Sequence, residues 1–529
     1  MLRRLSIVAI LFLTLPPLES AGQQAVRDFQ YVKDINPVLR SSNPAMLTVW
    51  TGKISSVQLE GTKGNGAVIP LEGSPDDFSV SASTESFFRT SEKIVYHGSL
   101  FWDDHQGKDM GGPIMMLPDF YPVNFLESDE TTTGTKKRSL YGLSGAQSRD
   151  IGERWALGFG FNYESGDMTK VKDPRFSNSL MDLKVLLGVS FKASDALLLG
   201  MALQYRNLLE QVKGGIYGTS DTQYFIDTDK GGFWGLTSEL AGDYNYISVS
   251  NLRPMANSMP GVSLQAVVNG CWSNEFTFGY RKGFFGKKAA ASPVFFNYSG
   301  LQAGYEGLLV IRRGEDIHRV ALTAGFADLS NDENVYRYIT PEGQSMVVEY
   351  FGSNNILART ELNADLDYRW YSDAGGPRPG GTLGVKAAYS ARYQTAVLYP
   401  FWRRQDFSNV CLDLYGGKSF SAGAFSFSIN GDLGAFYGWG TPGGRQDGSY
   451  DDNAISGIKS FDNYLGRYFE YKTAPRVYAS LGFTVARIFK DNLELYLTLS
   501  DRFDYLTDKA RYLAGRTRNL AGITLGCNF

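Results

Sequence analysis

Few residues in the chain are of the types that carry out catalysis. Its 529 residues include only three His and three Cys. His97 and Ser99 lie two positions apart, so on a strand they would share a face, where a histidine could activate a serine hydroxyl. They alternate with Tyr96, Leu100 and Trp102, so they should face the lumen. A hydrolase that acts on membrane lipid would instead turn such a pair toward the bilayer. The sequence therefore favours a protein that is not an enzyme.

Metal and nucleic-acid chemistry have equally little support. Asp227, Asp229 and Gly231 resemble half of a calcium loop, but the later ligands of such a loop do not line up. A second acidic cluster, at residues 447–452, is predicted to be a solvated loop. The 52 basic and 55 acidic side chains balance to a net charge of −3, which gives no electrostatic reason to expect nucleic acid. We expect no cofactor.

The strongest chemical pattern is a run of charges at alternate positions. Between residues 356 and 370 the even positions are mostly apolar and the odd positions are mostly charged, and two further cations follow in the next segment. Charges facing lipid are unfavourable, so this face should line a lumen, either as a structural ion-pair network or as a polar path for a solute. The predicted lumen-lining residues are Arg359, Glu361, Asp365, Asp367, Arg369, Lys386 and Arg392.

The elements that must hold these charges are strands. Residues 155–163 alternate large apolar and small or polar side chains, as one face of a strand does. Such segments are longer than the strands of soluble proteins, and the composition is rich in Gly (59) and in aromatic residues (14%). Trp155 and Tyr163 are about 26 Å apart along a strand, close to the height of a membrane-barrel band. The predicted aromatic girdle comprises Tyr96, Trp102, Trp155, Tyr163, Tyr368 and Trp370.

These patterns predict an all-β fold, a transmembrane antiparallel β-barrel of about 16 strands. Fusing or dropping a hairpin would give 14, and a further pair at 53–61 and 79–89 would give 18. Short turns should face the periplasm, and long extracellular loops are expected near 207–260, 284–297, 329–353 and 439–474. The predicted strands are 93–103, 139–148, 153–165, 181–192, 195–207, 262–271, 274–283, 298–311, 317–328, 354–371, 379–395, 407–418, 422–438, 475–487, 492–503 and 515–529.

The N-terminus predicts export. Arg3 and Arg4 precede a short apolar run and a small-residue site, which is typical of a secretory signal peptide over residues 1–22. Residues 23–79 are expected to be a plug, a periplasmic tail or the first strands, and residues 80–529 the barrel. The predicted location is the cell outer membrane, in contact with its lipid and lipopolysaccharide.

The C-terminus carries a second targeting pattern. Alternate apolar residues continue to a terminal aromatic residue, Phe529. This resembles the C-terminal signal read by the outer-membrane barrel assembly machinery, although Gly522 does not occupy the usual Gly position of that signal. The resemblance implies that this machinery is a partner.

Asn43-Pro44-Ala45 stands soon after the predicted signal peptide and ahead of many Gly- and aromatic-rich strands, of which TESFFRTSEKIVYHGSLFW is typical. In this the chain resembles FadL- and PorV-type outer-membrane barrels, and more closely an uncharacterised, domain-of-unknown-function barrel family of Bacteroidota. The resemblance implies a non-enzymatic barrel. FadL-type members pass hydrophobic solutes by an N-terminal hatch, but the charged inner face here departs from what a greasy channel needs.

Two functions follow as hypotheses. The first is passive, porin-like passage of a solute across the Gram-negative outer membrane. The alternative is an accessory barrel whose long loops dock a surface lipoprotein or a TonB-dependent transporter.

Overall fold

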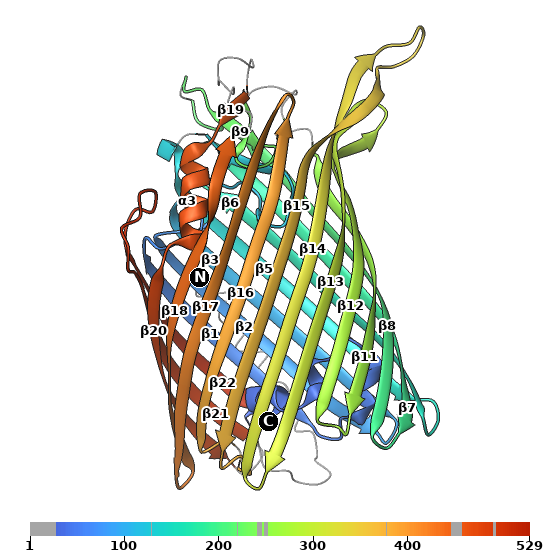
Figure 1. Ribbon diagram of the computed structural model, residues 1–529, viewed down its shortest axis with the longest axis vertical. Helices are drawn as coiled ribbons and strands as arrows, with labels where there is room; N and C mark the ends of the chain where they lie inside the picture. Colours follow the sequence, from blue (N-terminus) through green and yellow to red (C-terminus); the bar gives the residue numbers. More distant parts are fainter. Residues whose placement is uncertain are drawn as a thin grey trace.

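The computed structural model is an antiparallel β-barrel, closed where the last strand pairs with the first (Figure 1). It describes residues 28–128, 130–219, 221–240, 246–247, 252–376, 378–445, 458–489 and 493–529. The predicted signal peptide lies outside this range. Eighteen strands of the described chain form the ring, each hydrogen-bonded to its neighbours in sequence order.

The first half of the ring consists of β1 (Ile54–Gly66), β2 (Asp76–Ser91), β3 (Ile94–Met110), β5 (Gly134–Asp150), β6 (Trp155–Lys170), β7 (Arg175–Ser194), β8 (Leu197–Gly215), β11 (Pro254–Val268) and β12 (Trp272–Ala289). The second half consists of β13 (Ser292–Arg313), β14 (Asp316–Ile339), β15 (Val347–Ser372), β16 (Gly381–Leu398), β17 (Phe401–Ala422), β18 (Phe425–Arg445), β20 (Arg476–Phe489), β21 (Leu493–Leu506) and β22 (Thr517–Asn528).

We call the two ends of the barrel the turn end, where β1 begins and β22 ends, and the loop end. Residues that tolerate positive φ form the tight turns at the turn end. Between β11 and β12, for example, Asn269 and Gly270 have φ of 50° and 65°, as a tight hairpin turn requires. The loop end carries the connections that fold into further structure.

The strand count corrects the expected 16 to 18. The additional pair is β1 and β2, so the barrel begins at Ile54 and the expected boundary near residue 79 falls within β2. Two expected long loops are also wrong. Strands β12 and β13 continue through most of 284–297, and β14 and β15 continue through much of 329–353, because backbone pairing extends beyond the part of each strand with regular apolar alternation.

The alternation itself is confirmed by the exposure of the side chains. On β6, Leu157 and Phe159 are 49% and 50% exposed on the outer face, whereas Gly158 faces the lumen. Similar exposed Leu, Phe and Tyr side chains recur on the other strands of the ring. No helix in the described ranges is both long and apolar enough to cross a membrane.

Residues 28–50, here called the N-terminal segment, lie inside the barrel near its turn end (Figure 1). The segment consists of α2 (Phe29–Asp34), η1 (Pro37–Arg40) and η2 (Pro44–Val49). Asp28 caps α2 by accepting a hydrogen bond from the Tyr31 backbone N–H, and Pro occupies the first position of both 3₁₀ helices, where its missing N–H is harmless. The segment contacts β2, β11 and β15, which lie in distant parts of the ring, so it crosses the lumen.

Two structures lie at the loop end. Residues 111–123, the inward loop, pack their apolar side chains against the inner faces of β7, β8 and β11 to β15. The second structure, the cap, consists of a four-stranded sheet and the helix α3 (Asp462–Thr473). A one-turn 3₁₀ helix, η3 (Glu130–Thr132), precedes β5, and the strands of the small sheet are β4 (Asn124–Glu127), β9 (Phe225–Asp229), β10 (Trp234–Glu239) and β19 (Ile458–Ser460).

Candidate functional site in the lumen

A cavity of about 830 Å³ lies in the lumen beside the N-terminal segment. Its walls are the inner faces of β1, β15 to β18 and β20 to β22; the N-cap Asp28 and the α2 residues Tyr31 and Asp34 also line it. The lining is mainly hydroxyl, carboxylate, amide, guanidinium and glycine. Protein cavities of roughly 300–1,000 Å³ hold small-molecule ligands, so this volume suits a solute larger than a simple ion.

Ion pairs hold α2 against the wall of this cavity. Asp34 accepts hydrogen bonds from Arg369 Nη1 (2.6 Å) and from the Tyr371 hydroxyl (2.8 Å), and it lies 3.5 Å from Arg319 Nη2. At the start of the segment, Asp28 lies 3.4 Å from Arg378 Nε. A competing charged solute or water can break charged contacts of this kind. They are therefore suited to a segment that moves away from the wall, unlike the packing of an apolar core.

A third ion pair between the N-terminal segment and the wall involves His97, one of the two residues first considered for catalysis. Lys33 of α2 donates to Glu85 on β2 (2.7 Å), and Glu85 also lies 3.0 Å from His97 Nε2. Ser99 Oγ instead bonds Ser144 Oγ at 2.6 Å. The polar atoms of His97 and Ser99 thus have different partners, so the two residues do not form the arrangement that a serine hydrolase needs.

The middle of the N-terminal segment is seated by Asn43, which is 0% exposed. Its Nδ2 donates to the backbone oxygen of Val189 (3.1 Å) and to Gln265 Oε1 (2.9 Å), and its Oδ1 accepts from the Ala45 backbone N–H (2.9 Å). The Ala45 carbonyl accepts in turn from the hydroxyls of Ser148 (3.1 Å) and Ser190 (3.2 Å). The Asn-Pro-Ala motif is therefore a buried anchor that joins the segment by hydrogen bonds to three strands, β5, β7 and β11.

Glycines on the wall make room for this anchor. A Cβ added at Gly158 on β6 would overlap the backbone nitrogen of Ala45, and one at Gly188 on β7 would overlap Asn43 Oδ1. Gly158 and Gly188 are directly paired across β6 and β7, so they form one flat site on the inner face. We call Gly158 and Gly188 the glycine seat. Their close contact with the N-terminal segment explains why glycine occurs at these positions of otherwise regular strands.

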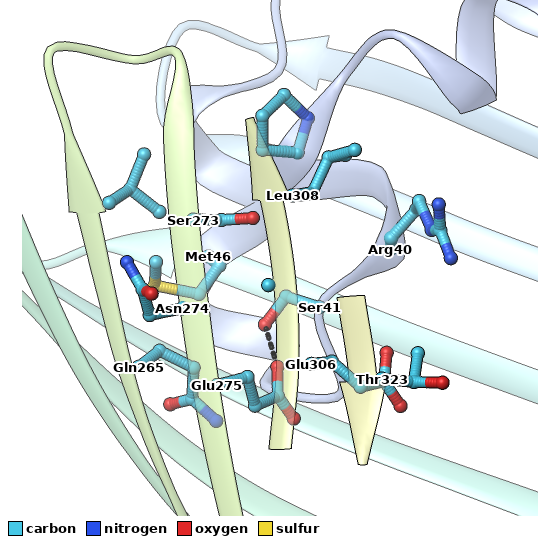
Figure 2. A pocket seen from close by; sticks show the side chains of 13 residues that line it. Arg40, Ser41, Met46, Gln265, Ser273, Asn274, Glu275, Glu306, Leu308 and Thr323 are labelled. Carbon is cyan, nitrogen blue, oxygen red and sulfur yellow. Dashed lines mark hydrogen bonds between the residues drawn. The ribbon is translucent and has the colours of Figure 1, made fainter. Parts of the chain in front are cut away.

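A second, much smaller space lies between the N-terminal segment and β11 to β14 (Figure 2). Its volume of about 30 Å³ is room for a water molecule, not a solute. In Figure 2, Ser41 lies against Glu275, to whose Oε2 its hydroxyl donates at 3.0 Å. Glu275 is paired with Glu306 on the adjacent strand. This space is part of the contact between segment and wall.

The predicted lumen-lining residues divide into three groups along the barrel axis. Arg359, Glu361 and Arg392 lie near the inward loop, where Arg392 Nε donates to Glu361 (2.6 Å). Asp365 and Lys386 form a pair of 3.4 Å at mid-height. The remaining two residues lie at the turn end, where Asp367 contacts Arg369 and Arg369 contacts Asp34 of α2.

The predicted girdle residues fall on the alternate positions that carry exposed apolar side chains. Trp155 packs on Phe191 with ring centroids 4.5 Å apart, and Tyr96 stacks on Phe88 at 5.5 Å. Trp155, Tyr96, Tyr368 and Trp370 lie close to the turn end of their strands, whereas Trp102 and Tyr163 lie near the middle of theirs. Their membrane-interface role stays a prediction.

Phe529 follows β22 and pairs with the start of β1. Its backbone N–H donates to the Ser55 carbonyl (3.0 Å), and the Ser55 N–H donates to the Phe529 carbonyl (2.8 Å). The last residue therefore contributes to barrel closure, and its role as an assembly signal stays a prediction.

Asp227 and Asp229, which resemble only half of a calcium loop, are buried in β9 of the cap and do not lie in a solvated loop. Asp229 Oδ1 accepts from the backbone N–H groups of Gly231 (2.8 Å) and Phe233 (3.0 Å), and Asp227 accepts from the Thr237 hydroxyl (2.7 Å). The described residues contain no group of three His, Cys, Asp or Glu side chains that could hold a metal, and residues 447–452 lie outside the described ranges. Burial raises the pKa of both Asp227 and Asp229 to about 6.

These raised pKa values predict a cap that is more stable in acid. Between about pH 4 and pH 6 the folded cap binds more protons than the unfolded one, so its stability falls as the pH rises through this window. Asp227→Asn should raise the free energy of cap opening at pH 7.5 by about 2–3 kcal/mol, because it removes the cost of a buried charge. Hydrogen exchange of residues 225–239 measures this, and at pH 4 the variant and the native chain should agree. Equal protection at pH 7.5 would contradict it.

The inward loop supplies site residues that strand alternation did not reveal. Asp119 lies between Lys472 Nζ (2.9 Å) and Arg392 Nη1 (3.4 Å). Partial desolvation by the surrounding protein opposes the charged form of Asp119, but Arg392 and Lys472 outweigh it and hold the pKa of this carboxyl well below its usual value. The Phe120 ring lies 3.7 Å from the Arg281 guanidinium. The only signal in the sequence is that LPDFYP interrupts the alternation with prolines and aromatic residues.

The chain is similar to several solved structures. BauA, the ferric preacinetobactin receptor from Acinetobacter baumannii, is 7% identical, with 90% of this chain and 79% of that chain covered and a TM-score of 0.39. The toluene transporter TbuX of Ralstonia pickettii is 8% identical over 96% and 95% of the two chains (TM-score 0.29), and a Pseudomonas aeruginosa FadL homologue is 10% identical over 92% of each (TM-score 0.28).

No curated protein matches the chain. A family match does cover the barrel from the Asn-Pro-Ala anchor to the terminal residue, over residues 44–529. The chain therefore belongs to the family of unknown function DUF6850.

Proposed function

We propose that the protein is an outer-membrane barrel that passes a polar solute through its lumen, with the N-terminal segment as the gate at the turn end. The observation that carries the proposal is the 830 Å³ cavity, which is lined by polar groups and bounded on one side by ion-paired α2. A hydrophobic solute would have to displace water from these groups without replacing their hydrogen bonds, so the lining favours a hydrophilic solute.

The exposed apolar outer face supports the membrane location. Side chains such as Leu157 and Phe159 cover the outside of the barrel, and an apolar surface that encircles a protein needs lipid rather than water around it. Cleavage of residues 1–22, placement in the cell outer membrane and assembly through Phe529 belong to this proposal.

Swelling of liposomes that contain the purified protein tests passage directly. We expect swelling in isotonic monosaccharide, with a rate that declines as neutral sugars of increasing size are used. The control is liposomes that contain a membrane protein without a β-barrel, added from the same detergent. If neither sugars nor small ions pass through the native chain or through a chain without the N-terminal segment, the proposal is wrong.

One observation favours the alternative of an accessory barrel. The hairpin of β14 and β15 projects beyond the rim at the loop end (Figure 1) and exposes apolar side chains there. Exposed aromatic and aliphatic residues outside a lipid band are typical of a protein-binding surface. They are Val335, Tyr338, Met346, Tyr350 and Phe351.

If this hairpin docks a surface lipoprotein or a TonB-dependent transporter, shortening it should abolish co-purification of that partner. Deletion of residues 337–348 is expected to leave barrel folding and liposome swelling unchanged. Recovery of the native chain only as a single species from gently solubilised membranes would remove the alternative.

A further inference from the structure

Three arginines from separate strands converge on the tip of the inward loop. Arg281 Nη1 on β12 and Arg359 Nη2 on β15 donate to the same oxygen, the Phe120 carbonyl, at 2.9 and 3.2 Å. Arg359 Nη1 also donates to the Tyr121 carbonyl (3.3 Å). Arg392 on β16 completes the set through Glu361, which it shares with Arg359. We call Arg281, Arg359 and Arg392 the arginine cluster.

The positive charge of this cluster exceeds the negative charge around it. Among the described residues, Arg281, Arg359, Arg392 and Lys472 lie beside three carboxylates: Asp119 and Glu361 pair with these cations, and Glu72 lies near Lys472. Arg281 and Arg359 are 4% and 7% exposed, so water does little to compensate them. Two neutral backbone carbonyls occupy the place where charged acceptors would be most favourable.

The cluster also has unused donors and an open side. Among the described residues, Arg281 Nη2 and Arg359 Nε have no hydrogen-bond partner within normal geometry; their nearest polar neighbours are the Tyr298 side chain for Arg281 and the Glu361 carboxylate, 3.8 Å away, for Arg359 Nε. The Asp119 side chain is 45% exposed and that of Glu361 is 35% exposed, so the edge of the cluster is accessible. A planar guanidinium with free N–H groups binds an oxyanion in a two-pronged manner.

We propose that the arginine cluster is an oxyanion-binding site that the inward loop occupies in the closed protein. The Phe120 and Tyr121 carbonyls and the Asp119 carboxylate stand where the oxygens of a solute's carboxylate or phosphate group would bind. An entering anion displaces the loop tip, which widens the lumen at the loop end. The inference rests on the proposed function for its role in passage, and it specifies the polar solute as anionic.

Calorimetric titration of the purified, detergent-solubilised protein with inorganic phosphate at low ionic strength tests the site independently of passage. The native chain should bind phosphate. Asp119→Asn should bind it more tightly, about fivefold to tenfold, because the competing carboxylate is gone, and Arg359→Gln should weaken binding about tenfold or more. Arg502→Gln is the matched control, since Arg502 lies on the inner wall at β21 and pairs with Asp504 (3.0 Å).

The oxyanion site is supported if Arg359→Gln loses affinity for phosphate and Arg502→Gln does not. If this result is obtained while the liposomes show no swelling, the proposed passage of a solute is refuted and the binding site is not. Heat-modifiable migration on gels checks that each variant is folded, and Arg281→Gln decides if Arg359→Gln does not fold. Absence of phosphate binding by both the native chain and Asp119→Asn would overturn the inference. Equal affinity in the Arg359 and Arg502 variants would overturn it as well.

Discussion

Deletion of residues 29–49 is expected to raise the conductance of the reconstituted protein about tenfold or more. A barrel of 18 strands is wide enough for an aqueous channel, and the N-terminal segment crosses this lumen near its turn end. The cavity beside α2 would then open directly to the turn end. Single-channel recording in planar bilayers measures the change.

Deletion of residues 340–346 is the control for this experiment, because that turn joins β14 to β15 outside the lumen. Asp34→Asn provides an independent test in a full-length chain. It removes the charge that Arg369 and Arg319 hold in place, so it should increase the frequency of opening without changing the conductance of the open state. Unchanged conductance of the deletion variant would show that the N-terminal segment is not the gate.

Substitution of one glycine should release the same segment without removing it. In Gly158→Ala the new Cβ overlaps the backbone of Ala45, which cannot move aside as a flexible side chain could. Overpacking of this kind costs about 1–3 kcal/mol, so the backbone amides of residues 43–50 should exchange about 10–100 times faster with deuterated water. Mass spectrometry of the exchanged protein measures this.

Gly160 offers a matched control on the same face of β6. A Cβ there meets its nearest atoms at 3.5–3.6 Å, which is ordinary contact. Gly160→Ala should therefore leave exchange of the segment unchanged. Equal exchange in the two variants would contradict a seat formed by Gly158, whereas faster exchange in Gly158→Ala alone, together with greater conductance, would connect the seat to the gate.

Period-two alternation was sufficient to predict the barrel and the direction of its side chains. The reason is that each residue of a strand points either outward or into the lumen, so the side-chain types of neighbours such as Leu157 and Gly158 indicate which face is which. The same reasoning undercounted strands at β1 and β2. Many of the outward positions of β1 are small or polar, such as Gly61, and the apolar pattern there is too weak to count.

By itself, the sequence predicted a barrel with a charged inner face, and it presented Asn43-Pro44-Ala45 only as a short motif without an evident role. Only the tertiary structure decided what the lumen contains. Asp34 meets Arg369 across 335 positions of the chain, and Phe120 meets Arg359 across 239. Contacts between residues so far apart leave no periodicity, because they depend on how an irregular segment folds back into a closed ring.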